Sequence, residues 1–523
     1  MACVFYSPEA FSDDLRRVIL ASRNAHAVRA CLLTTRDRDH AFTWLKQVVS
    51  DADWPLYGFT VAARRRYNFD KLKWEAVGGE SSDTLGLLRH AQELRNGAVV
   101  VLEDCAAFLR DEGGDQRVRM SLAEMLSSET ITEGLVLVFL EPPEAAGRLP
   151  AILADQFVRL EVPYPRASEL EAIARAELSI AAHHARVPMD VESIREKAEY
   201  LARELAGLTR TAARDALRDA LAPNPSDLDA AFARLQRRKA LTLRESLGMN
   251  VLDTLDVEEP IGLDYLFEYI EVIQPKLLVT GEERAKGIWL IGPPGTGKTM
   301  IARSIGRHVK LPVVEFRVSS LMNSLLGETE NRFRRAFATL EAMSPNVALM
   351  DEIEKAFGDS SERDGGTMMR ATGALLSWLS DNPHPNFIVA TSNSLRRMGE
   401  IGQTMTRSER FDAFFFVDVP CLDSRRRMLE RWLADRMPNC DAAADELAQL
   451  TEKFSGADLR SLVKRAVRCA EHDDVVLTLD MVKTQVERKR MRALALYDEF
   501  QELRRWGMKH CEPAGLTDTR GLP

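Results

Sequence analysis

A glycine-rich segment in the middle of the chain restricts the possible folds more than any other feature. It reads Gly292-Pro-Pro-Gly-Thr-Gly-Lys298-Thr299 and follows an apolar run at 288–291. Apolar side chains at helical spacing over residues 300–309 predict a helix directly after it. A strand, a glycine loop and a helix in this order are typical of a site where backbone N–H groups curl around phosphates. The pattern predicts that Lys298 contacts the β- and γ-phosphates and that Thr299 holds Mg²⁺.

Polar residues end the next two apolar runs. The run at 347–350 is followed by Asp351 and Glu352, and the run at 387–392 is followed by Asn393. Such runs are typical of strands buried in a parallel sheet. We expect Asp351 to orient the water shell of the metal and Glu352 to act as general base toward the attacking water. Asn393 can orient that water or contact the γ-phosphate, although a strand-end Asn alone is more often a turn former.

Two arginines, Arg407 and Arg410, precede the predicted strand at 414–419. By themselves they could be surface charge. An arginine supplied by a neighbouring molecule, however, greatly stabilises a phosphoryl group in transfer. Because the three preceding motifs are present, we favour the interpretation that these arginines act on a neighbouring molecule. It predicts that the active form is an oligomer.

Taken together, residues 245–485 resemble the AAA family within the AAA+ superfamily. Ile261 and Gly262 match its adenine-contacting segment, although one of the usual paired glycines is missing, and residues 454–459 match its helical-lid signature. The resemblance implies ATP and Mg²⁺ as ligands, ATP hydrolysis, and a homo-oligomeric ring, by family a hexamer. The catalytic residues that it implies are Glu352, Lys298, Asn393, Arg407 and Arg410. The nucleotide-binding residues are Ile261, Gly262, Gly292, Pro293, Pro294, Gly295, Thr296, Gly297, Lys298, Thr299, Met300, Gly456 and Ala457, and the metal-binding residues are Thr299 and Asp351.

Three further positions depart from the family pattern. Leu325 and Leu326 stand where unfoldases of the family carry an aromatic residue that grips substrate, and Glu409 stands where a glycine is usual. Leucine is apolar but cannot stack, which puts polypeptide threading by the usual grip in doubt. Alternatively, both leucines simply pack beneath a helix.

The first half of the chain repeats the pattern of the second without its phosphate loop. The apolar run at 98–102 followed by Glu103 and Asp104 mirrors the run that ends at Asp351 and Glu352. After the apolar segment 31–34, however, residues 35–40 contain neither glycine nor lysine. Since Asp37 and Asp39 would repel an anion, we expect no nucleotide hydrolysis here. This layout resembles the cyanobacterial and plastid hypothetical-open-reading-frame ATPases, which pair a degenerate first AAA module with an intact second one.

The predicted fold class is α/β, with two tandem AAA modules, each a parallel P-loop sheet with a small helical lid. The expected domains are a degenerate α/β module at 1–165, its lid at 166–221, a linker at 222–260, the active α/β module at 261–420, the second lid at 421–485, and a C-terminal helix and tail at 486–523. We expect one helix over 482–510. Its basic face could be solvated, could dock a partner or could contact nucleic acid. Residues 511–523 are expected to form a loose tail.

Composition limits the choice of function. The formal net charge of −9 and the pI of about 5.7 argue against nucleic acid as a partner. No apolar run approaches membrane-spanning length, and the seven dispersed cysteines indicate reduced thiols, so a cytoplasmic protein is predicted. We therefore expect an ATP-hydrolysing protein that remodels an unknown protein or complex. The alternative is a nucleotide-switched scaffold or regulatory adaptor with slow hydrolysis, and DNA loading is disfavoured by the acidic balance.

Overall fold

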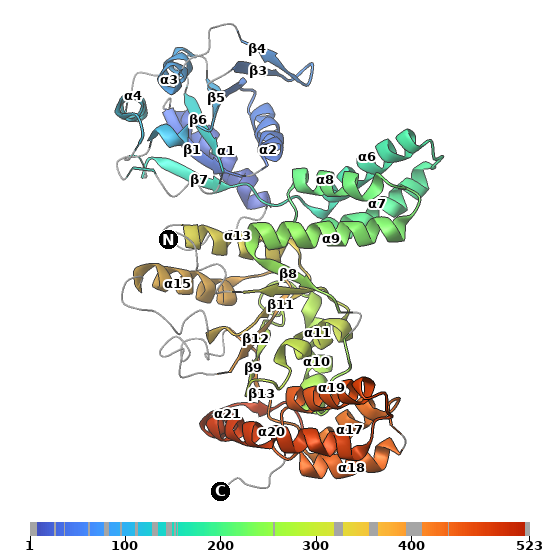
Figure 1. Ribbon diagram of the computed structural model, residues 1–523. Coiled ribbons are helices and arrows are strands. Elements are labelled where there is room, and N and C mark those ends of the chain that lie inside the picture. Colours follow the sequence, from blue (N-terminus) through green and yellow to red (C-terminus); the bar gives the residue numbers. More distant parts are fainter. Residues whose placement is uncertain are drawn as a thin grey trace. The chain divides into compact units, whose positions relative to one another are not determined.

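The computed structural model divides the chain into two compact units, residues 1–239 and 240–523 (Figure 1). It describes residues 8–517 except 26–27, 36, 61–62, 78–82, 95–96, 110–112, 128–133, 143–148, 151–152, 154, 255–256, 318–327, 355–364, 394–409 and 438. Each unit contains one mostly parallel sheet, so the predicted α/β class is confirmed.

The sheet of the first unit has the strand order β4-β3-β2-β5-β6-β1-β7 within the described residues. The neighbouring strands β2, β5, β6, β1 and β7 pair in parallel. Strand β3 runs antiparallel to both of its neighbours, β2 and β4. Its strands are β1 (Val28–Thr34), β2 (Leu56–Phe59), β3 (Arg64–Asn68), β4 (Lys73–Ala76), β5 (Ala98–Glu103), β6 (Leu135–Glu141) and β7 (Phe157–Glu161). The buried strands β5 and β6 are almost continuously apolar because both of their faces are covered.

Helices cover both faces of this sheet. α1 (Pro8–Ala25) and α2 (Arg38–Asp51) pack on one face, and α3 (Thr84–Glu93), the 3₁₀ turn η1 (Ala106–Leu109) and α4 (Gln116–Ser127) pack on the other (Figure 1). After β7 the chain forms a helical bundle with its own apolar core. Its helices are α6 (Ala167–Ala185), α7 (Val191–Leu205), α8 (Arg210–Leu221) and the start of α9 (Leu228–Leu247).

The sheet of the second unit has the order β14-β13-β9-β12-β11-β10-β8 in the described part of the chain. Only β8 runs antiparallel to its neighbour there. The strands are β8 (Met249–Leu252), β9 (Gly287–Ile291), β10 (Val313–Phe316), β11 (Asn346–Met350), β12 (Asn386–Ser392), β13 (Ala413–Phe416) and β14 (Glu512–Pro513). The five mutually parallel strands of the first sheet lie in the order β2-β5-β6-β1-β7, and five strands of the second sheet lie in the order β10-β11-β12-β9-β13. When each set is numbered along the chain, the two orders are the same.

Helices also enclose the second sheet. α10 (Asp264–Ile273), the 3₁₀ turn η3 (Gln274–Leu278) and α11 (Lys298–Val309) lie on one face, and α13 (Glu328–Ala342) and α15 (Gly365–Asp381) lie on the other (Figure 1). A second helical bundle follows, made of α17 (Leu422–Leu433), α18 (Cys440–Leu450), α19 (Gly456–His472) and α20 (Leu479–Glu499). None of the described helices is both long and apolar enough to cross a membrane.

The C-terminal region differs from the sequence prediction in three ways. The expected single helix over 482–510 is two helices, α20 and α21 (Gln501–His510), which meet at Phe500. The expected loose tail is wrong for residues 511–517, because residues 512–513 form strand β14 and Ala514 is 1% exposed. A wholly solvated basic face is also wrong, because Arg504 is buried against Asp418 at 2.7 Å.

Candidate active site

The loop between β9 and α11 takes a conformation that requires glycine. Gly295 and Gly297 have φ angles of +83° and +86°, in the left-handed region that side chains disfavour. At Gly292 a Cβ atom would lie 2.1 Å from the carbonyl oxygen of Val417. Gly297 is the N-cap residue of α11, so the loop presents backbone N–H groups at a helix N-terminus. This part of the site is therefore built to hold an anion.

Lys298 is the first residue of α11 and its side chain folds into the loop. The Nζ atom donates to the carbonyl oxygens of Gly292 and Pro293 at 2.8 Å each, and the residue is 7% exposed. Burial lowers the pKa of Lys298 to about 8, although the carboxylates of Glu354 and Asp351 oppose the shift. A buried ammonium at the base of a glycine loop is suited to contact phosphate oxygens.

Two hydroxyl groups hold Asp351 at the end of β11. Thr299 Oγ1 donates to Oδ2 of Asp351 at 3.0 Å, and Thr391 Oγ1 donates to Oδ1 at 2.6 Å. Thr391 also accepts from the backbone N–H of Glu352 at 2.8 Å. The two predicted metal-binding residues, Thr299 and Asp351, are thus brought together. Thr391 was missed by sequence reasoning, although its position near the end of β12 gave a usable signal.

Glu352 and Asn393 also meet at this edge of the sheet. Asn393 Nδ2 donates to Oε1 of Glu352 at 3.4 Å, a long hydrogen bond, and its backbone N–H donates to Oε1 of Glu354 at 2.9 Å. Glu352 has a φ of +49°, an uncommon conformation for a side-chain-bearing residue. Glu354 is 2% exposed and was not predicted as part of the site. It fixes the backbone of Asn393 and adds negative charge near Lys298.

A hollow lies beside the glycine loop, between the sheet and the second bundle. Of the predicted nucleotide-binding residues, Ile261, Gly262, Thr296, Met300 and Gly456 line it. The backbone N–H of Ala457 donates to the carbonyl oxygen of Gly295 at 3.0 Å, which ties α19 to the loop. Residues 514–517 also line the hollow, and the sequence gave no signal for them.

The remaining predicted residues are only partly placed. Arg410 lies in a turn before β13 and is half-buried, whereas Arg407 lies outside the described residues. Leu325, Leu326 and Glu409 also lie outside them. The predicted roles of the two arginines stay predictions.

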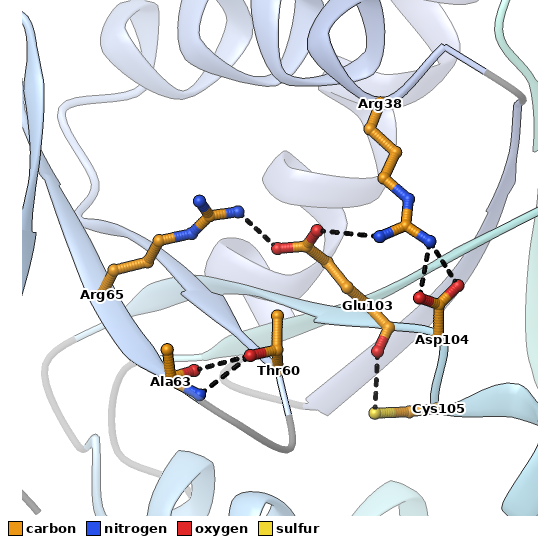
Figure 2. Close-up of polar contacts among 7 residues, drawn as sticks. All are labelled: Arg38, Thr60, Ala63, Arg65, Glu103, Asp104 and Cys105. Atoms are coloured by element: carbon orange, nitrogen blue, oxygen red, sulfur yellow. Dashed lines mark hydrogen bonds and ion pairs between the residues drawn. The ribbon is translucent and has the colours of Figure 1, made fainter.

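At the corresponding edge of the first sheet, the acidic residues form ion pairs with arginines of the same unit (Figure 2). Glu103 ends β5, and Asp104 has a positive φ of +56°, much as Glu352 has a φ of +49° after β11. Arg38, the first residue of α2 as Lys298 is of α11, contacts Glu103 at 3.6 Å and Asp104 at 2.5 Å. Arg65 on β3 contacts the 6% exposed Glu103 at 2.5 Å. Both acidic groups are thus neutralised by guanidinium groups of the same unit.

Asp37 fills the place of the glycine loop in the first unit. It is the N-cap residue of α2, is 2% exposed, and accepts from the backbone N–H of His40 at 3.1 Å. Its other bonds come from the helical bundle, where the N–H and hydroxyl of Thr211 donate at 3.0 and 3.2 Å. A carboxylate therefore sits at the N-termini of both α2 and α8, where the helix dipoles favour an anion.

A further acidic residue, Glu141, ends β6 in the same unit. It is 4% exposed, and its carboxylate accepts from the backbone N–H of Ala106 at 2.7 Å. Burial raises the pKa of Glu141 to about 7; the accepted hydrogen bonds and Arg38 oppose this shift, and Asp104 adds to it. Glu141 is therefore a titrating group in the physiological range inside the first unit.

The fold and the site of the second unit define a nucleotide-binding module of the phosphate-loop type. Residues 288–419 match the family model of the ATPase family associated with various cellular activities (AAA), and residues 441–481 match the AAA+ lid domain. The chain therefore carries an AAA ATPase module with an AAA+ lid. The resemblance expected from the motifs is confirmed for this half of the chain.

Several individual proteins are also similar to this chain in sequence. It is 33% identical over 213 residues to the "Uncharacterized AAA domain-containing protein ycf46" of Trieres chinensis, which covers 39% of this chain and 42% of that protein. The ycf46 protein of Guillardia theta is 26% identical over 78% of both chains. The proteasome-activating nucleotidase of Aeropyrum pernix is 27% identical over 48% of this chain and 64% of that protein. The alignment with the Trieres protein thus spans less than half of its length.

Proposed function

We propose that the second unit binds and hydrolyses Mg²⁺-ATP, and that the chain uses this cycle as a homo-oligomeric ring, by family a hexamer, to remodel a protein or protein complex. The main support for this proposal is that five polar side chains meet at one edge of the sheet. Lys298 lies in the loop, Thr299 and Asp351 are joined by a hydrogen bond, and Glu352 lies beside Asn393. All of these groups lie at the carboxyl ends of parallel strands or at the start of α11, where a sheet of this class holds its ligand.

Each residue has a distinct role in this proposal. The loop N–H groups and Lys298 bind the phosphates, and the hydroxyl of Thr299 and the carboxylate of Asp351 offer oxygen donors that fit Mg²⁺. When bound, the metal ion neutralises charge on the phosphates. Glu352 accepts a proton from the attacking water, and Asn393 holds that carboxylate in place. Arg407 and Arg410 would serve the site of a neighbouring chain.

For the first unit we propose a degenerate AAA module that does not hydrolyse nucleotide. Its shared strand order with the second unit supports common architecture. The ion pairs of Arg38 with Glu103 and Asp104 use the groups that would otherwise face Mg²⁺ and the phosphates. The carboxylate of Asp37 would also repel a phosphate in the short loop before α2.

The test of hydrolysis is the Glu352→Gln variant. It should bind ATP as the wild type does but turn over at least about 100 times more slowly, because it lacks the general base. Glu452→Gln, on an exposed residue of the same unit, is the matched control and should keep the wild-type rate. A wild-type rate in Glu352→Gln would remove Glu352 from the mechanism.

A second candidate function is a nucleotide-switched scaffold or regulatory adaptor with slow hydrolysis. The ion pairs of the first unit favour this scaffold function, since a module without a hydrolysis cycle is suited to be a docking surface. ATPase measurements with and without an unfolded protein, and separately with DNA, distinguish the two. Stimulation by the protein supports remodelling, and a slow rate that no addition changes supports the scaffold. Proteins retained by Glu352→Gln in ATP would then identify the partner.

A further inference from the structure

The hollow beside the glycine loop has a wall that comes from the far C-terminus. Its lining includes residues 260–263, which precede α10, and residues 514–517, which follow β14. We call residues 501–517, comprising α21, β14 and the four residues after it, the C-terminal segment. It lies beyond the second bundle in sequence, yet it returns to the sheet edge next to β13 (Figure 1).

Hydrogen bonds fix this return at Ala514. Its backbone N–H donates to the carbonyl oxygen of Phe416 on β13, and its own carbonyl oxygen accepts from the N–H of Leu266 on α10, each at 3.0 Å. Ala514 is 1% exposed. Both backbone groups of one buried residue thus tie the C-terminal segment to the two elements that flank the hollow.

A buried ion pair anchors the helix of the segment to the same wall. Arg504 Nε contacts Oδ2 of Asp418 at 2.7 Å, and the two side chains are 8% and 3% exposed. Asp418 itself lines the hollow. Because breaking a buried pair leaves an uncompensated charge, this contact holds α21 firmly in one position.

The closest approach is between two glycines. A Cβ atom on Gly515 would lie 2.0 Å from the carbonyl oxygen of Gly262, and Gly262 has a φ of +77°. The backbone of the C-terminal segment therefore rests directly on the segment that contains Ile261 and Gly262. Leu516 comes next, lines the hollow and is 58% exposed, so its apolar surface is available to a ligand.

We propose that residues 514–517 form the wall of the pocket that contacts the base of the bound nucleotide, and that this contact sets much of the affinity of the second unit for ATP. The inference rests on the proposed function. A flat apolar ring placed in the hollow would cover Leu516 and meet the backbone of Gly262 and Gly515, which is how pockets commonly hold an aromatic ligand. In the proposed function the phosphates bind at the adjacent glycine loop, into which the Lys298 side chain folds.

The test compares ligands with and without a base. In Leu516→Asp, Kd for ATP should rise about tenfold, whereas Kd for inorganic tripolyphosphate should stay within about twofold, because the phosphate loop is untouched. Leu278→Asp is the matched control, since Leu278 is 64% exposed in the same unit and does not line the hollow. It should leave both Kd values unchanged.

A second variant keeps the test independent of one side chain. Gly515→Val should push the segment off Gly262 and raise Kd for ATP by at least about 30-fold. Its control is Gly373→Ala, where an added Cβ meets no atom within 4 Å. If the wild type bound no ATP, the proposed function would fail. If the wild type bound ATP and both Leu516→Asp and Gly515→Val bound it equally well, the base-contacting wall would be wrong. Equal loss of ATP and tripolyphosphate would also overturn it.

Discussion

The buried carboxyl group of Glu141 makes the stability of the first unit depend on pH. Its pKa is raised from the ordinary value of 4.5 to about 7 by burial. The groups that face it are the N–H groups of Ala106 and Cys105, the carboxylate of Asp104 and the guanidinium of Arg38. Because the folded state holds this proton more tightly than the unfolded state, stability is fully present below pH 4.5 and is lost as pH rises through about 7.

The size of the effect follows from the two pKa values. Each pH unit between them changes the free energy of unfolding by about 1.4 kcal/mol. From about pH 5 to about pH 8 this residue should lower the stability of the first unit by about 2 to 3 kcal/mol. Glu141→Gln keeps an oxygen that can accept from Ala106 but cannot ionise. It should therefore be more stable than the wild type at pH 8, and the difference should shrink toward pH 5.

Hydrogen exchange of β5 and β6 amides, measured in a urea series on the full chain, isolates the opening free energy of the first unit. Glu196→Gln, on an exposed position of α7, is the control and should follow the wild-type profile. Parallel pH profiles for the wild type and Glu141→Gln would refute the reasoning, since the buried carboxyl would then not be the titrating group.

Four further predictions concern the second unit. Lys298→Ala should abolish measurable ATP binding in a fluorescence titration, because the buried ammonium that faces the phosphates is removed. Calorimetry should give one nucleotide per chain, and a stoichiometry near two would contradict the degenerate first site. Thr391→Val should lower kcat about tenfold or more while binding changes little, because Asp351 loses one of its two hydroxyl partners and the N–H of Glu352 loses its acceptor. A chain with Arg407→Ala and Arg410→Ala should bind ATP yet hydrolyse it only about 10⁻³ as fast, and mixing with Lys298→Ala chains should restore part of the rate. Failure of this rescue in verified mixed oligomers would return both arginines to surface charge.

Most of the candidate active site in the second unit could be predicted from local sequence patterns. The residues from Gly292 to Thr299 could be placed because strand, loop and helix are adjacent in sequence, and a strand-end position predicted Asp351 and Asn393. Neither Thr391 nor Glu354 was predicted. Thr391 lies near the end of β12 and Glu354 lies two residues after Glu352, and it is their contacts in the fold that show how they hold Asp351 and Asn393 in place.

The C-terminal region could not be predicted for a different reason. Strand β14 is two residues long, so it has no periodicity to detect. The ion pair between Arg504 and Asp418 joins positions 86 residues apart. In the first unit, the position of Asp37 before a helix is recognisable as an N-cap. Its contact with Thr211 joins residues 174 apart in sequence, so no local pattern could predict it.

Under the proposed function, the contact between Asp37 and Thr211 bears on how the chain would respond to the ratio of ATP to ADP. In the second unit, the backbone N–H of Ala457 on α19 donates to the carbonyl oxygen of Gly295 in the glycine loop, so a nucleotide in the loop would bind directly beside the lid. In the first unit a covalently attached carboxylate occupies the corresponding place at all times. If the first unit binds no nucleotide, as we propose, its bundle is held in the same way at any ratio of ATP to ADP. Motion driven by nucleotide exchange would then be confined to the second unit, against a first unit that stays constant.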